Sequence, residues 1–210
     1  MPELTMICYI CLQPGADSDD HIIPRAFFPS PRPSNLVTLP AHYSCHNRLP
    51  EEYVRVILAG LSETSAAAQR LNAAEVTRSL RRNDPLRESL LRTLIPRAEI
   101  RSPAGLVLGA APAVQFDRAR FYPLLGKIVR GLYRHHTGRF LPVDAIMNWA
   151  IREPLVGGRA DLFRATAQGL RYPEVFECRY GVAAEAATEM TIWWLRFYSG
   201  VVLRCLTRIG

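Results

Sequence analysis

The sequence predicts an α+β protein: a small metal-stapled module, then a mainly helical region, then an antiparallel β patch at the end of the chain. Three observations carry this prediction. Cysteine and histidine pairs gather among prolines before residue 60, helical periodicity dominates the middle, and aromatic and β-branched residues dominate the tail. The change in composition divides the chain into a module at 1–59 and a second region at 60–210.

The composition favours a folded protein with an acidic polymer as its partner. Hydrophobic residues make up 49% of the 210 residues, which is enough for a core. The formal net charge is +7, and because Lys127 is the single lysine, nearly all of the positive charge is arginine. Guanidinium groups match phosphate geometry, so nucleic acid is the expected partner. A solvated basic surface is the alternative interpretation.

The cysteines indicate metal binding rather than a disulfide framework. Their number is odd, and three of the five lie in the first module. The first residues lack the pattern of a signal peptide, and no apolar run reaches the length of a membrane span. We therefore expect a cytoplasmic protein without a membrane segment, in which clustered thiols bind metal.

The first module is expected to contain short strands and one helix. "TMICYI" at 5–10, "HII" at 21–23 and "NLVTL" at 35–39 have the residue types of strands. The proline-rich stretch between the last two is a loop, because proline cannot take part in a sheet ladder. A helix is predicted within 43–61, where apolar residues recur at helical spacing.

The remainder predicts helices followed by strands. Helices are expected at 62–82, at 83–95 with Asp84 as its N-cap, and at 117–138, where Gly138 ends the helix. Strand-like pieces lie at 100–116, 172–181, 189–200 and 201–209. Trp193 and Trp194 would alternate on a strand, one toward the core and one toward solvent.

Two ligand pairs predict a structural zinc site. Cys8 and Cys11 form a C-x2-C pair, and His42 and Cys45 form an H-x2-C pair. Three sulfurs and one imidazole suit tetrahedral Zn2+ and leave no open position, so such an ion would hold the fold rather than react. His46 in place of His42 is the alternative fourth ligand.

Beside the zinc set, Asp20, His21, Asn35 and His46 occur in that order. With "CYIC", "SDDHIIP", "NLVTLPAHYSCHN" and "EEYVR", the first 55 or so residues resemble the HNH endonucleases, the zinc-stapled branch of the ββα-metal (His-Me finger) nucleases. The second knuckle of these nucleases is commonly C-x2-C, and His42 stands here at its first position. Histidine is also a good zinc ligand, so the departure is compatible with the resemblance.

The resemblance implies a mechanism. Asp20 and His46 would hold one catalytic Mg2+ or Mn2+, His21 would be the general base, and Asn35 would brace the hairpin that carries His21. Asp19 is the alternative to Asp20, and Asn47 is the alternative to His46. The resemblance implies products with 5′-phosphate and 3′-hydroxyl ends, and a twisted hairpin that brings Asp20 and His21 to one site.

The sequence thus predicts a metal-dependent endonuclease that acts on nucleic acid, with DNA favoured over RNA. Two other functions stay open: a zinc-stapled nucleic-acid-binding module without catalysis, and a subunit of a bacterial defence complex whose activity depends on a protein partner. If both strands are cut, a homodimer or two successive cleavage events are expected. A run of arginines in the middle of the chain indicates either a duplex-binding face, which an attached nuclease module favours, or a solvated helical surface: Arg78, Arg81, Arg82, Arg87, Arg92, Arg97 and Arg101.

Overall fold

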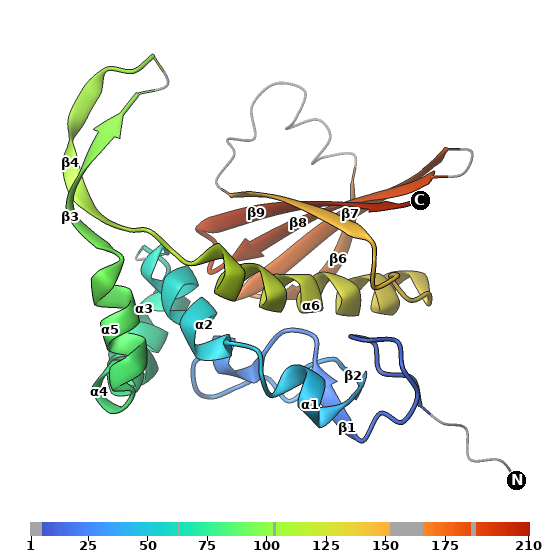
Figure 1. Cartoon of the computed structure of the whole chain (residues 1–210). Coiled ribbons are helices and arrows are strands. Elements are labelled where there is room, and N and C mark those ends of the chain that lie inside the picture. The colour runs from blue at the N-terminus through green and yellow to red at the C-terminus, as the bar shows by residue number, and fades with distance from the viewer. Residues whose placement is uncertain (1–5, 63, 103, 152–165, 186–187) are drawn as a thin grey trace, which may run out of the picture.

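The computed structural model describes residues 6–62, 64–102, 104–151, 166–185 and 188–210 (Figure 1). It confirms the predicted mixture of helices and strands. The elements before the middle of the chain are β1 (Ser18–His21), η1 (Arg25–Phe27), β2 (Thr38–Ala41), α1 (Tyr43–His46), α2 (Glu51–Gly60), α3 (Ala66–Leu71), the π-helical η2 (Asn72–Val76), α4 (Thr77–Arg82) and α5 (Asp84–Arg92). After them come β3 (Leu94–Arg101), β4 (Val107–Val114), α6 (Arg118–Thr137), β5 (Ile146–Ile151), β6 (Ala167–Tyr172), β7 (Phe176–Glu185), β8 (Thr188–Phe197) and β9 (Val201–Ile209).

The N-terminal module is a two-stranded hairpin followed by a short helix. β1 and β2 pair antiparallel from Ser18 opposite Ala41 to His21 opposite Thr38, and α1 begins two residues after β2. The strand predicted at 5–10 is wrong over its described part, residues 6–10. That segment makes a single bridge between Ile7 and Pro14, because the chain must turn tightly between the two cysteines of the first knuckle.

The helix predicted at 83–95 forms, but its cap is one residue earlier than predicted. The Asn83 side chain, not Asp84, accepts a hydrogen bond from the backbone N–H of Leu86 at 3.0 Å. Asp84 is instead the first helical residue, and Pro85 follows it. A carboxylate in the first turn still favours the helix through its dipole.

The strands β3 and β4 form an extended hairpin that projects from the body (Figure 1). Most of its side chains are exposed, including Leu106 and Leu108 near its tip. An isolated two-stranded hairpin gains little stability from burial. The sequence predicts strand-like pieces at 100–116 and so anticipates β4, but it misses most of β3, whose first two residues it assigns to the preceding helix.

The predicted long helix and the terminal antiparallel sheet are both confirmed. Helix α6 ends at Gly138, which takes the left-handed conformation with φ of 70°. The sheet has the strand order β5-β9-β8-β7-β6, and every pairing is antiparallel. One face of this sheet lies on α6, and the N-terminal module lies on the other side of α6 (Figure 1).

The two tryptophans of β8 do not divide between core and solvent as predicted. Trp193 packs in the main core against α6, and Trp194 is only 2% exposed on the other face. The guanidinium of Arg204, on the neighbouring strand β9, lies 5.9 Å from the Trp194 ring centroid and covers part of that indole.

One hydrophobic core crosses the boundary near residue 59. Phe27 of the module packs edge-on against Phe197 of the sheet, with ring centroids 5.8 Å apart. The hydroxyl of Tyr198 donates to the Phe27 carbonyl at 2.9 Å. The same buried cluster includes Ile22, Tyr53 and residues of α6. Among the described residues, no helix has both the length and the apolar character needed to cross a membrane.

Candidate metal centre and active site

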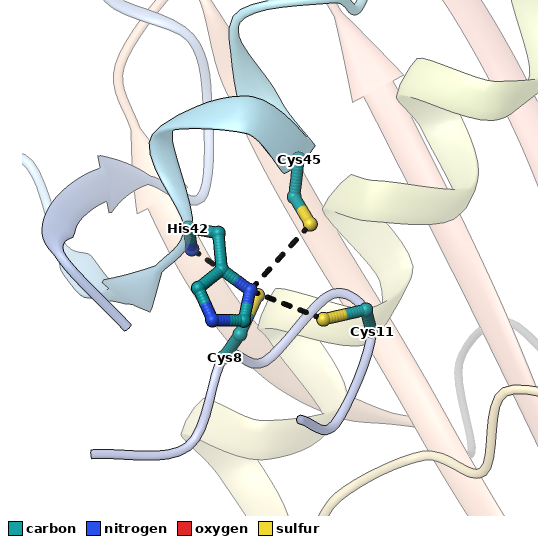
Figure 2. Close-up of side chains that lie close together, drawn as sticks. All are labelled: Cys8, Cys11, His42 and Cys45. Carbon is teal, nitrogen blue, oxygen red and sulfur yellow. Dashed lines mark hydrogen bonds between the residues drawn. The ribbon is translucent and has the colours of Figure 1, made fainter. Parts of the chain in front are cut away.

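Cys8, Cys11, His42 and Cys45 converge as the spacing predicted (Figure 2). Their ligand atoms all lie within 4.8 Å of one another. The Nδ1 atom of His42 is 3.3 Å from Cys11 Sγ and 3.8 Å from Cys45 Sγ. Ligands around tetrahedral zinc would be about 3.5 Å apart for a sulfur and a nitrogen, so the cluster could hold a zinc ion.

The surroundings of His42 select the ring nitrogen that faces the sulfurs. Its Nε2 lies 3.1 Å from the Pro14 carbonyl oxygen, which can only accept a hydrogen bond. The proton of the neutral ring therefore sits on Nε2, and Nδ1 keeps its lone pair for a metal. The backbone N–H of His42 donates to Cys8 Sγ at 3.3 Å.

The thiols of the cluster differ in acidity. Burial raises the pKa of Cys8, but backbone N–H groups of Cys11, His42 and Ile10 outweigh it and lower that pKa below its ordinary value. Burial and the neighbouring sulfurs of Cys11 and Cys8 raise the pKa of Cys45 to about 12. Several thiolates in one place repel one another, so a bound cation is needed to keep them all deprotonated.

His46 is not part of this cluster, so the alternative zinc set is wrong. Cys45 and His46 are neighbours on α1, where successive residues point about 100° apart. Cys45 therefore faces the knuckle and His46 faces the hairpin. There its Nδ1 lies 3.8 Å from Asp20 Oδ1, and its Nε2 lies 3.1 Å from Ser18 Oγ.

The hydrogen bond of Ser18 fixes how the His46 ring is placed. The Ser18 hydroxyl donates its one hydrogen to the Ala41 carbonyl at 2.8 Å. Its oxygen must therefore accept from Nε2–H of His46. In the neutral ring, Nδ1 then presents a lone pair to the Asp20 carboxylate, and two acceptors face each other. A proton on Nδ1, a water that donates to both atoms, or a cation shared by both would relieve this contact.

Asp20 is the carboxylate that faces His46, and the two alternative residues, Asp19 and Asn47, lie elsewhere. Asp20 is 5% exposed, whereas Asp19 is exposed on the opposite face of β1. Asn47 is also exposed and lies beyond the end of α1. The structure thus brings together Asp20 and His46, the two residues that the resemblance named first. Among the described residues, no third Cys, His, Asp or Glu joins the pair to form a second possible metal-binding group.

His21 is the last residue of β1 and is half-buried. The pairing of β1 with β2 is regular up to His21, so Asp20 and His21 leave the strand on alternate faces. The twisted hairpin that was expected to bring Asp20 and His21 to one site therefore does not break the pairing of β1 with β2 here. The His21 ring is nevertheless affected by groups of the site. Burial lowers its pKa most, and the charge of Arg25 lowers it next. The charge of Asp20 raises this pKa, and that of Lys127 lowers it.

Asn35 lies in the loop before β2, and its side chain is exposed. Its backbone carbonyl oxygen accepts a hydrogen bond from the Tyr172 hydroxyl at 3.4 Å. The same hydroxyl accepts from the backbone N–H of Val37 at 2.9 Å. Here Tyr172 of β6, rather than the Asn35 amide, ties down the strand end opposite His21, and Ile22 N–H donates to the Val37 carbonyl at 3.0 Å.

Two residues at the site were missed by sequence reasoning. The Lys127 ammonium of α6 lies 2.8 Å from Asp20 Oδ2, and the Tyr9 hydroxyl donates to the same oxygen at 2.5 Å. Tyr9 is hidden within the first knuckle and carries no motif. Lys127 did carry a signal: it is the single lysine in a chain whose other long cations are arginines.

A groove with a volume of about 590 Å³ begins at His46. It runs between the start of α2, helix α5 and the first turn of α6, and its wall includes Glu51, Arg92 and Arg120. Burial raises the pKa of Glu51, the nearby Asp20 charge adds to this, and Lys127 opposes it. The groove gives a ligand bound at His46 room to continue along the protein.

The chain matches no protein-family model, no curated protein and no solved structure.

Proposed function

We propose that the protein is a metal-dependent endonuclease of the HNH type that hydrolyses phosphodiester bonds, with DNA as the favoured substrate. One observation carries the proposal. Asp20 Oδ1 and His46 Nδ1 face each other at 3.8 Å on a hairpin and helix that the Cys3His cluster holds together. His21 follows Asp20 directly in β1, and Asp20, His21 and His46 occur in the order that this class of nuclease uses.

Asp20 and His46 would hold the catalytic Mg2+ or Mn2+. A carboxylate oxygen and an imidazole nitrogen suit either ion, with water filling the remaining positions. Such an ion supplies positive charge for the scissile phosphate and for the leaving oxygen. The surrounding residues hold the two ligands in position: Ser18 fixes the ring of His46, and Tyr9 with Lys127 fixes the carboxylate of Asp20.

His21 would take the proton from the attacking water. A neutral imidazole can do so near pH 7, since its ordinary pKa is about 6.5. The expected brace for this residue is supplied by backbone pairing and by Lys127, whose Nζ donates to the His21 carbonyl at 2.6 Å. Asn35 stays a prediction as a positioning residue.

Nucleic acid fits the charge of the surface near the site. Arg25, Arg48 and Arg118 are exposed, and Arg25 is close enough to His21 to affect its pKa. The groove at His46 adds Arg92 and Arg120. Arginine forks bind phosphate oxygens without reading sequence, so the supported substrate class is a phosphodiester chain.

The test is cleavage of supercoiled plasmid by the zinc-loaded protein with Mg2+ or Mn2+. Wild-type protein should nick or linearise the plasmid, and His21→Ala should lose this activity by a factor of about 100 or more. His135→Ala is the matched control, because His135 is an exposed histidine at the far end of α6. The control should cleave like wild type.

Two results would contradict the proposal. Equal cleavage by wild type and His21→Ala would remove His21 as the base. Absence of cleavage by properly folded, zinc-loaded wild type, on DNA and on RNA, would favour a binding module or a subunit that needs a protein partner.

A further inference from the structure

Lys127 is buried at the centre of the molecule and touches both consecutive residues of the proposed site. Its side chain is 1% exposed. Its Nζ lies 2.8 Å from Asp20 Oδ2 and 2.6 Å from the His21 carbonyl oxygen. Because Lys127 comes from the middle of α6, a residue outside the N-terminal module completes the environment of the metal ligand.

The two oxygens of Asp20 have different surroundings. Oδ2 is taken by two donors, Lys127 Nζ and the hydroxyl of Tyr9. Oδ1 is the atom that faces His46 Nδ1. The carboxylate is thereby held so that it can offer one oxygen, and not both, to a cation. Both donors are buried, so this orientation is kept in the absence of any ligand.

Lys127 also puts a fixed positive charge next to the place where a divalent cation would bind. The charges of Asp20 and Lys127 offset each other, which leaves the pair without net charge. A second cation on Asp20 Oδ1 would be repelled by the ammonium a few ångströms away, in a region where water screens little.

An anionic ligand would remove this penalty. A phosphate next to the ion brings negative charge into the same site, which favours the ion and is favoured by it. The binding of the ion and that of the phosphodiester would then be coupled, and each would strengthen the other by the same factor.

We propose that Lys127 is a positioning residue that presents Asp20 through one oxygen and keeps the affinity of the free protein for the catalytic cation low, so that the ion binds together with the nucleic acid. This inference rests on the proposed function. It goes beyond that function by assigning to α6 control of when the metal site is filled.

A purely structural role for Lys127 makes the opposite prediction. If Lys127 only held Asp20 in place, Lys127→Met would loosen the carboxylate and weaken cation binding. If its charge opposes the cation, Lys127→Met should strengthen binding to the free protein. Tyr9→Phe is the matched control, because it removes the other donor to Asp20 Oδ2 and changes no charge at neutral pH.

The experiment measures the apparent Kd for Mn2+ by the electron paramagnetic resonance signal of free Mn2+. It uses the full zinc-loaded chain carrying His21→Ala, with and without a short DNA duplex. The His21 carbonyl is part of the backbone, so this background keeps the Lys127 contact. The duplex should tighten Mn2+ binding by about tenfold or more. Lys127→Met should tighten binding without DNA by a similar factor and shrink the effect of the duplex, whereas Lys127→Arg and Tyr9→Phe should not tighten it.

Different results test the role of Lys127 and the presence of the metal site separately. Unchanged or weaker Mn2+ binding by folded Lys127→Met, with normal binding by the background protein, overturns the role of Lys127 alone. Mn2+ binding that survives Asp20→Asn, or that is absent with and without DNA, overturns the metal site and with it the proposed function. Should Lys127→Met lose zinc or cooperative unfolding, Lys127→Gln carries the same comparison, because its amide can still donate to the His21 carbonyl.

Discussion

At the scale of single residues, hydrogen bonds to a second group decide what each histidine can do. Nε2 of His42 donates to the Pro14 carbonyl, and Nε2 of His46 donates to Ser18 Oγ. Both rings therefore present Nδ1, one to the sulfur cluster and the other to Asp20. Two histidines four residues apart thus serve different sites, and each site depends on an acceptor that carries no motif.

The zinc cluster gives the first prediction at this scale. Cys45→Ser should reduce bound zinc well below the stoichiometry of wild type, which we expect to be about one ion per chain, and lower the thermal midpoint, because zinc binding is coupled to folding. Metal analysis and thermal unfolding check this. Cys178→Ser is the control for zinc content, since Cys178 is buried on β7 and is not part of the cluster. Equal zinc content in Cys45→Ser and wild type would contradict the assignment.

At the scale of elements, caps and packing determine where the helices begin and end. Asn83 starts α5 through its bond to Leu86 N–H, and its amide also donates to Glu52 of α2 at 2.8 Å. One side chain thereby caps α5 and ties it to α2 of the N-terminal module. Gly138 ends α6 because the left-handed conformation costs glycine little.

The cap predicts a difference between two neighbouring substitutions. Asn83→Ala should lower the free energy of unfolding by about 1 kcal/mol or somewhat more, because it loses the cap and the bond to Glu52. Asp84→Ala should cost only a few tenths of that, since Asp84 makes an exposed ion pair with Arg87. Denaturant unfolding of the two variants checks the order, and a larger loss for Asp84→Ala would restore Asp84 as the cap.

At the scale of the whole molecule, α6 is the layer that joins the metal module to the terminal sheet. Its Lys127 reaches Asp20, and its Tyr133 packs against Trp193 of the sheet. Gly131 lets the helix approach the module closely. A Cβ atom there would lie 2.9 Å from Ile22 Cγ2 and 3.2 Å from Tyr9 Cε2. Ile22 follows His21, and Tyr9 bonds Asp20, so this contact lies directly behind the site.

The close approach predicts what an added methyl group does. Gly131→Ala should lower the free energy of unfolding by about 1–3 kcal/mol and impair plasmid cleavage, because α6 or the hairpin must move. Gly126→Ala is the matched control one turn away. Its Cβ would meet Met147 Sδ at 3.5 Å, an ordinary contact, and alanine favours a helix. Equal stability and activity of the two variants would show that the module and α6 are not held as closely as the structure places them.

The sequence alone predicted the fold class and the four residues of the Cys3His cluster, because these follow from short spacings and local patterns that act within one turn or one hairpin. The resemblance to the HNH endonucleases, and not a spacing, named the pair Asp20 and His46. From the sequence, the strand at 5–10 and the N-cap of α5 were misplaced, because the local residue patterns there fit more than one structure. Tertiary structure alone decided the rest, because the partners are far apart in the chain. Lys127 meets Asp20 across 107 positions, and Tyr172 braces the loop at Asn35 across 137. Such contacts depend on how α6 and the sheet pack, which no local pattern encodes.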